Sequence, residues 1–165
     1  MEKSRKDAPL ICLIVTAIAL IGIIIGLITK NPIVIILLLL PTAIYEVMRT
    51  QGKSTKAASI ILLVVLVAQI FVLMLDIDFN VAEFFGATHQ YIGGYLLPLG
   101  ELRIVAPALM AVLAVILFVR TWGVYTRWLA ATIFFTSFAL IYVLDPQAFQ
   151  DLFAYAAQQG LRYIR

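Results

Sequence analysis

Long apolar segments, each about the length of a membrane-crossing helix, fill most of this chain of 165 residues. A helix needs about 20 predominantly apolar residues to cross the hydrocarbon core of a bilayer. The composition agrees, because 64% of the residues are hydrophobic and 13% are charged, against about 45–50% and roughly 25% in soluble domains. These values exclude a water-soluble fold and predict an all-α, polytopic integral membrane helical bundle.

Five segments reach spanning length, and we expect them to form one membrane domain covering residues 1–165. The predicted spans are 10–29, 32–48, 57–75, 102–119 and 129–144. The stretch 76–101 interrupts the apolar pattern and is expected to be an extracytoplasmic loop, half-buried or with a short surface helix. Residues 146–163 carry apolar side chains on one helical face and polar ones on the other, which predicts an amphipathic helix lying in the membrane interface.

Two features of the spans predict helix packing. Gly22 and Gly26 form a GxxxG motif, in which small residues let helix backbones approach closely. We expect this seam to face either another helix of the bundle or a partner protein. Gln69 is the only polar residue inside the third predicted span. An amide at that depth usually bonds to a neighbouring helix, and a transport site is the alternative.

Polar residues between the spans predict where helices begin and end. Asn31 suits an N-cap and Pro32 suits the first helical position. Ser54 is the expected N-cap of the third span. Glu46 and Arg49 lie three residues apart at the end of the second span and are expected to pair there.

The distribution of Lys and Arg predicts the orientation through the positive-inside rule. One side of a five-span chain receives Lys3, Arg5, Lys6, Arg49, Lys53, Lys56, Arg120 and Arg127. The other side receives Lys30, Arg103, Arg162 and Arg165. We therefore expect a cytoplasmic amino terminus, a carboxy-terminal helix on the non-cytoplasmic face, and a place in a bacterial inner (plasma) membrane. These residues are scattered singly between apolar runs, so they offer no basic face to a nucleic acid.

The stretch between the third and fourth spans begins like a calcium loop. Asp76, Asp78 and Asn80 match the D-x-D-x-N opening of an EF-hand. Such a loop needs glycine at its sixth position and glutamate at its twelfth, where this chain has Val81 and Ala87. The EF-hand is therefore rejected.

Other chemistry in the same stretch depends on its acidic residues and the sole histidine. Asp76, Asp78, Glu83 and His89 have oxygen and imidazole donors that several divalent metals accept, and a solvated loop is the alternative. One histidine excludes bis-histidine haem ligation, although it suffices for a chlorophyll-type magnesium or a quinone carbonyl. No serine–histidine–acid set, paired-histidine motif or phosphate loop is present, so we expect no enzymatic activity, resident metal or cofactor.

The leading functional hypothesis is a small, non-catalytic accessory or assembly subunit of a larger membrane protein complex. Its expected partners are the lipid bilayer and other membrane subunits. The predicted interaction platform consists of Asp76, Asp78, Glu83, Phe84, Phe85, Phe149 and Phe153. One alternative is a small transporter or channel component with a polar path through Glu46, Gln69 and a kink at Pro41. The other is a cofactor- or pigment-binding electron-transfer subunit that uses His89.

Overall fold

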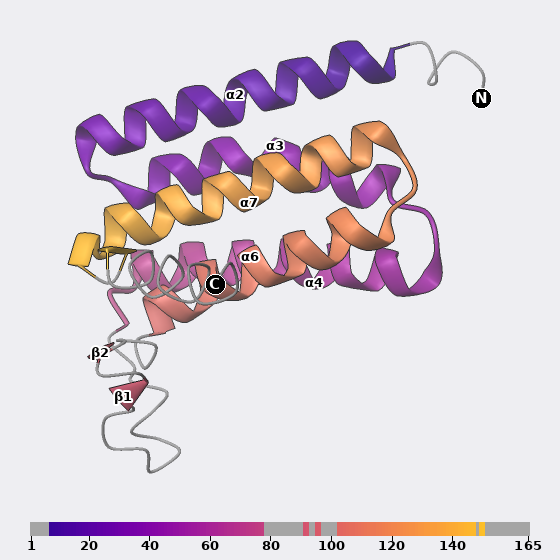
Figure 1. Ribbon diagram of the computed structural model, residues 1–165. Coiled ribbons are helices and arrows are strands. Elements are labelled where there is room, and N and C mark those ends of the chain that lie inside the picture. The colour runs from indigo at the N-terminus through magenta and orange to yellow at the C-terminus, as the bar shows by residue number, and fades with distance from the viewer. Residues whose placement is uncertain (1–6, 78–90, 93–94, 97–101, 148, 151–165) are drawn as a thin grey trace, which may run out of the picture.

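The computed structural model describes residues 7–77, 91–92, 95–96, 102–147 and 149–150. Its main elements are the helices α2 (Ala8–Thr29), α3 (Pro32–Arg49), α4 (Lys53–Met74), α6 (Leu102–Arg120) and α7 (Val124–Leu144) (Figure 1). Each of these five helices is long and apolar enough, by length and composition, to cross a membrane. The predicted class of helical bundle with five spanning-length helices is confirmed at that level.

A short β-hairpin occupies part of the stretch between α4 and α6. Strand β1 (Tyr91–Ile92) pairs antiparallel with β2 (Tyr95–Leu96). The expectation of an irregular loop or short surface helix was incomplete at these four residues. Two glycines separate the strands in the sequence, and a Gly-Gly pair between β-branched or aromatic residues is a hairpin signal.

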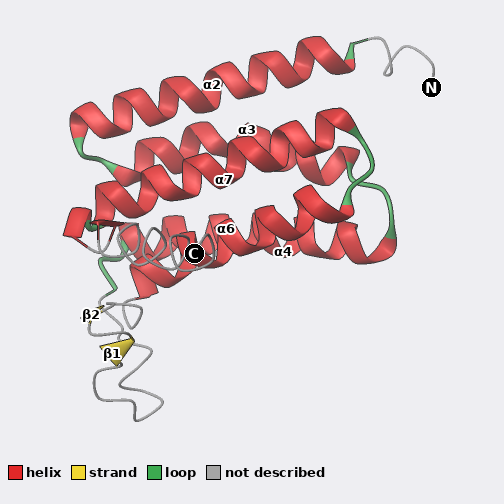
Figure 2. Cartoon of the chain, in the orientation of Figure 1, coloured by secondary structure: helices red, strands yellow, loops and turns green. Residues whose placement is uncertain are grey.

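Consecutive helices run antiparallel. Short turns join α2 to α3, α3 to α4 and α6 to α7, as is usual for neighbours in a bundle, whereas residues 75–101 separate α4 from α6. α3, α4, α6 and α7 form a ring in which each helix packs against its two neighbours, and α2 packs against α3 and α7 (Figures 1 and 2). The α3–α4 and α6–α7 turns therefore lie at one end of the bundle. The α2–α3 turn and the last turn of α7 lie at the other end.

The turn between α2 and α3 follows the predicted capping chemistry. Lys30 ends α2 in the left-handed conformation, with φ of 51°. Asn31 is the N-cap of α3, its Oδ1 accepting a hydrogen bond of 3.0 Å from the N–H of Ile33. Pro32 occupies the first helical position, where its missing N–H leaves no intrahelical bond unmade. Both predictions are confirmed.

Two helices begin earlier than their apolar segments do. α4 starts at Lys53 instead of Ala57, and α7 starts at Val124 instead of Leu129. The predicted N-cap at Ser54 was therefore wrong, since Gly52 takes that position with φ of 105°. Hydropathy identifies the part of a helix that can enter a bilayer, whereas the helix itself extends into the less apolar residues that precede that part.

The carboxy-terminal region after α7 is described only at its start. Residues 146–147 and 149–150 are helical, and the Asp145 carboxylate accepts a hydrogen bond of 2.9 Å from the N–H of Gln147. This side-chain hydrogen bond caps the start of the segment. The rest of the expected amphipathic helix 146–163 lies outside the described residues.

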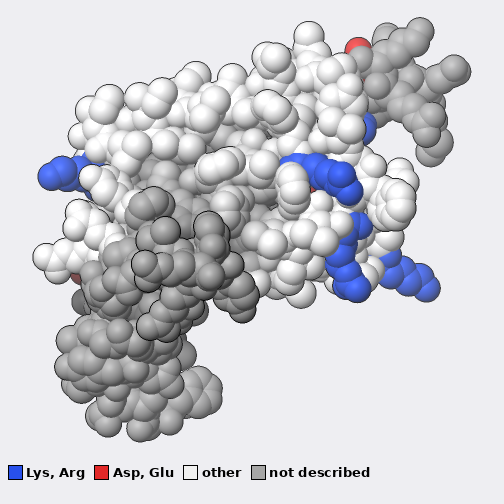
Figure 3. All heavy atoms as spheres, viewed as in Figure 1, with Lys and Arg blue, Asp and Glu red and all other residues white. Residues whose placement is uncertain are grey.

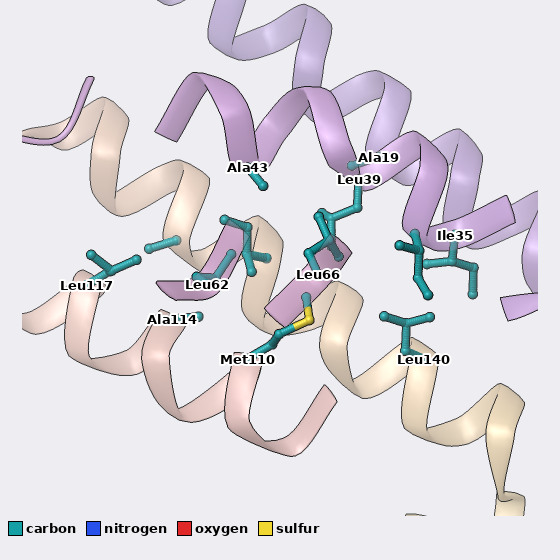
Figure 4. Close-up of a cluster of buried hydrophobic side chains, with 13 residues drawn as sticks. Ala19, Ile35, Leu39, Ala43, Leu62, Leu66, Met110, Ala114, Leu117 and Leu140 are labelled. Atoms are coloured by element: carbon teal, nitrogen blue, oxygen red, sulfur yellow. The ribbon is translucent and has the colours of Figure 1, made fainter. Parts of the chain in front are cut away.

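An aliphatic core joins all five helices (Figure 4). Its thirteen buried residues are Ala19, Ile35, Ile36, Leu39, Ala43, Leu62, Leu66, Met110, Ala114, Leu117, Ala130, Ile133 and Leu140. The outer surface is apolar as well, with Leu13, Ile28 and Val64 between 61% and 77% exposed. Helices that are hydrophobic on all sides belong to large protein cores or to membranes. In a bilayer, close packing and interhelical hydrogen bonds would then drive their association.

Candidate functional site

The glycine seam of α2 lies inside the bundle, against α3. Gly22 and Gly26 are both buried. A Cβ added at Gly22 would lie 2.6 Å from the Leu38 Cβ, and one added at Gly26 would overlap the Ile35 Cγ1. Both glycines therefore allow the two backbones to approach closely, and this surface is already covered by the chain's own helix.

A buried carboxyl group lies where α2, α3 and α7 meet. The Glu46 side chain on α3 is 1% exposed. Its Oε1 accepts a hydrogen bond of 3.0 Å from the Thr50 hydroxyl, while Oε2 has no hydrogen-bond partner among the described residues. Neighbouring contacts tie α2 to α7, since the Trp128 Nε1 donates to the Thr16 hydroxyl at 3.0 Å.

The expected pairing of Glu46 with Arg49 is wrong. No ion pair within 4.0 Å joins these two residues, both of which lie in the described part of α3. The Arg49 guanidinium instead lies 6.0 Å from the ring centroids of Tyr45 and Tyr125. Aromatic faces attract guanidinium groups at this distance, and the two rings hold Arg49 between α3 and α7.

Gln69 forms a hydrogen bond between helices at the opposite end of the bundle. Its Nε2 donates to the Arg103 carbonyl at 2.9 Å and so joins α4 to α6. Four residues after Arg103 comes Pro107, which lies inside α6 and has no N–H for that carbonyl. Gln69 thus supplies the donor that the proline cannot. The Arg103 side chain also pairs with Asp76 at 2.6 Å.

Glu46 and Gln69 are not brought together. At 1.5 Å of rise per residue, Glu46 lies about 4 Å from the end of α3, and Gln69 lies about 24 Å from the start of α4 at that same end of the bundle. About 20 Å therefore separates them along the bundle axis. Aliphatic residues such as Leu62 and Leu66 fill this interval (Figure 4).

The basic residues gather at the end where α3 meets α4 and α6 meets α7 (Figure 3). Those of the described chain at this end are Arg49, Lys53, Lys56, Arg120 and Arg127. The opposite end has Lys30 and Arg103, the latter paired with Asp76. The charge asymmetry read from the sequence is thus an asymmetry between the two ends of the bundle.

Five of the seven residues of the predicted interaction platform lie outside the described residues, namely Asp78, Glu83, Phe84, Phe85 and Phe153, and so does His89, the residue of the cofactor alternative. Two of its members are described. Asp76 pairs with Arg103 across the start of α6, and Phe149 folds back onto α7, with its ring 5.5 Å from that of Tyr142. Among the described residues no three His, Cys, Asp or Glu side chains gather into a metal site.

Two site features escaped the sequence analysis, the burial of Glu46 and the Arg103–Asp76 pair. The first could not be read from spacing, because it depends on α2 lying over α3 and α7. The second could not be read from spacing either, because Asp76 and Arg103 lie 27 residues apart in the sequence.

Comparisons with protein-family models, with curated proteins and with solved structures found no match to this chain. The class is therefore defined by the fold alone. It is a helical bundle with five described helices of membrane-spanning length, packed as a four-helix ring with one additional helix.

Proposed function

We propose that this chain is an integral membrane protein of a bacterial inner membrane, with its amino terminus and basic end in the cytoplasm. Support comes from the five spanning-length helices and from the excess of Lys and Arg at one end of the bundle. Lys and Arg are retained on the cytoplasmic side of membrane proteins. In this orientation the stretch between α4 and α6 and the region after α7 share the opposite face.

Within the membrane, we propose the role of a non-catalytic accessory or assembly subunit. The observation that carries this proposal is the closed aliphatic core, to which all five described helices contribute. The paths that ions or substrates follow through transporters and channels are lined by polar or ionisable groups. Here the polar groups at Glu46 and Gln69 stand about 20 Å apart along the axis, with Leu and Ile side chains between them.

A role in assembly places the contact surface outside the core. The α2 glycine seam is occupied by α3, so it is not the partner surface. The candidate surface is the predicted platform, formed by the stretch between α4 and α6 and by the amphipathic helix after α7. In the proposed orientation both lie at one membrane surface, where aromatic and apolar groups favour docking.

One observation favours the transporter alternative. Glu46 is a carboxyl group buried among helices, with one oxygen lacking a partner in the described part of the chain. Such groups mark ion or proton paths in many membrane proteins. A path through one copy of this chain would have to cross the aliphatic core, so a transport role for Glu46 would require a partner or a second copy to complete the path.

The test is purification of the tagged full-length chain from its native membrane in mild detergent. We expect a stoichiometric protein partner. Deleting residues 151–165, or replacing Phe84 and Phe85 with serine, should release that partner. The deletion keeps Phe149, whose packing on α7 belongs to the bundle.

The matched control is His89→Ala, which changes the same stretch without removing an aromatic anchor of the platform. It should leave the complex intact and its absorption spectrum unchanged. Loss of a bound pigment or metal in this variant would support the cofactor alternative. Recovery of the wild-type chain without any stoichiometric partner would overturn the assembly role.

A further inference from the structure

Four exposed cations stand on two adjoining turns at the basic end. Lys53 and Lys56 belong to the first turn of α4, Arg120 ends α6, and Arg127 belongs to the first turn of α7. We call these four residues the basic turn pair. Because Lys53 and Lys56 are three residues apart on a helix, their side chains lie on the same face.

Hydrogen bonds hold the two turns together. The Arg120 Nη1 donates to the Ser54 hydroxyl at 3.1 Å, which links the end of α6 to the start of α4. The Arg127 Nε donates to the Thr121 carbonyl at 2.9 Å, which closes the α6–α7 turn. The two arginines of the basic turn pair are thus held by hydrogen bonds, and the two lysines lie on the same helical turn as Ser54.

The electrostatics of this surface are unfavourable without an anion. α4 and α7 both begin here, with Gly52 and Gly123 as N-caps that make no side-chain capping bond, and their first turns contain no acidic residue. A helix N-terminus has a partial positive charge, so Lys or Arg placed beside it is repelled. The described acidic residues at this end are Asp7, the N-cap residue of α2, and the buried Glu46.

Exposed aromatic residues indicate the depth at which this surface lies in a bilayer. Trp122 is 96% exposed in the α6–α7 turn, and Trp128 is 58% exposed on α7. Tryptophan side chains favour the headgroup level of a bilayer. The anion available in quantity at that level is the phosphate of a phospholipid.

We propose that the basic turn pair binds the headgroup of an anionic phospholipid. Basic groups between transmembrane helices on the cytoplasmic side are suited to such headgroups, and arginine and backbone N–H groups are both good phosphate donors. The inference depends on the proposed membrane insertion and orientation, but not on the proposed role as an assembly subunit.

The experiment compares lipids on the purified full-length protein. Phosphatidylglycerol and phosphatidylcholine, with matched acyl chains, are titrated into the detergent-solubilised protein, and bound lipid is counted by native mass spectrometry. We expect preferential retention of phosphatidylglycerol. The double variant Lys53→Gln/Lys56→Gln should bind it about 25-fold more weakly, at roughly fivefold for each basic residue near an anionic surface.

The control is Lys30→Gln, which removes an exposed cation at the opposite end of the bundle. It should leave lipid binding unchanged. Equal retention of the two lipids by the wild-type protein would overturn the proposal. So would equal losses in the control and the double variant, or full competition by inorganic phosphate at low millimolar concentration.

This result is separable from the assembly role. If the double variant loses phosphatidylglycerol but keeps its protein partner, the lipid site stands independently. If no partner exists, the lipid titration is unaffected.

Discussion

The hydrogen bond from Gln69 to the Arg103 carbonyl allows a quantitative test of the bundle. The carbonyl would normally accept from the N–H four residues later in α6, but that residue is Pro107. If Gln69 compensates for the proline, then Gln69→Leu should destabilise the wild-type protein. It should do so much less in a Pro107→Ala background, where the backbone N–H is restored.

The expected magnitude follows from the contacts. An interhelical hydrogen bond in a membrane contributes about 0.6 kcal/mol on average and up to about 1.7, and a buried carbonyl left without a donor costs about 1–3 kcal/mol. The Gln69 Oε1 is buried without a partner among the described residues, which reduces the benefit of the amide. We therefore expect Gln69→Leu to cost about 1–1.5 kcal/mol alone and less than about 0.5 kcal/mol beside Pro107→Ala.

The assay is the free energy of unfolding in mixed micelles for the wild type, the two single variants and the double variant. Their coupling energy should be about 1 kcal/mol, above the 0.3–0.5 kcal/mol within which distant sites are additive. Pro41→Ala provides the matched control, since it restores an N–H in a different helix. An equal cost of Gln69→Leu in the wild-type and Pro107→Ala backgrounds would refute the compensation.

Three further predictions concern other parts of the bundle. Gly22→Ile and Gly26→Ile should each lower the free energy of unfolding by more than about 2 kcal/mol through overpacking. Ala17→Ile, on the exposed face of α2, is the control and should change that free energy by less than about 0.5 kcal/mol. Equal effects at all three positions would contradict the packing of the two glycines against α3. Glu46→Gln should not lower the free energy of unfolding, because the amide keeps an oxygen for the neighbouring hydroxyl and removes a buried carboxyl group. Reporter fusions should report cytoplasm at the α3–α4 and α6–α7 turns and the opposite compartment at His89, and a cytoplasmic signal at His89 would reject the proposed topology.

The number of spanning-length helices could be predicted because apolar length is a local property. The first break was also predictable, since Asn31 and Pro32 each act through their own backbone geometry. The starts of α4 and α7 could not be found in the same way. Their first turns are polar or aromatic, so hydropathy stops short of them, although the helix continues to Lys53 and Val124.

The junctions were less predictable because they depend on which helices meet. Spacing within α3 suggested an ion pair between Glu46 and Arg49, yet Tyr125 from α7 competes for the guanidinium. The same holds for Gly22 and Gly26. The GxxxG motif alone could not show whether α3, through Leu38, or a partner protein packs against them. Periodicity thus located the surfaces, and only the tertiary arrangement identified what covers them.

The buried polar groups of this bundle act mainly in packing, and this bears on where its function lies. Gln69 serves the carbonyl that Pro107 leaves without its N–H, and the Thr42 hydroxyl donates across to the Val15 carbonyl at 3.1 Å. The α7 hydroxyls of Thr136 and Ser137 return to carbonyls of their own helix. Side chains already engaged in such bonds are poor candidates for binding a transported substrate.

The two ends of the bundle differ in their chemistry. One end has the basic turn pair and two helix starts without a side-chain cap, and the other is where the stretch between α4 and α6 and the region after α7 begin. The two proposed interactions, with a protein partner and with a lipid headgroup, therefore fall at opposite ends of the bundle and would not compete.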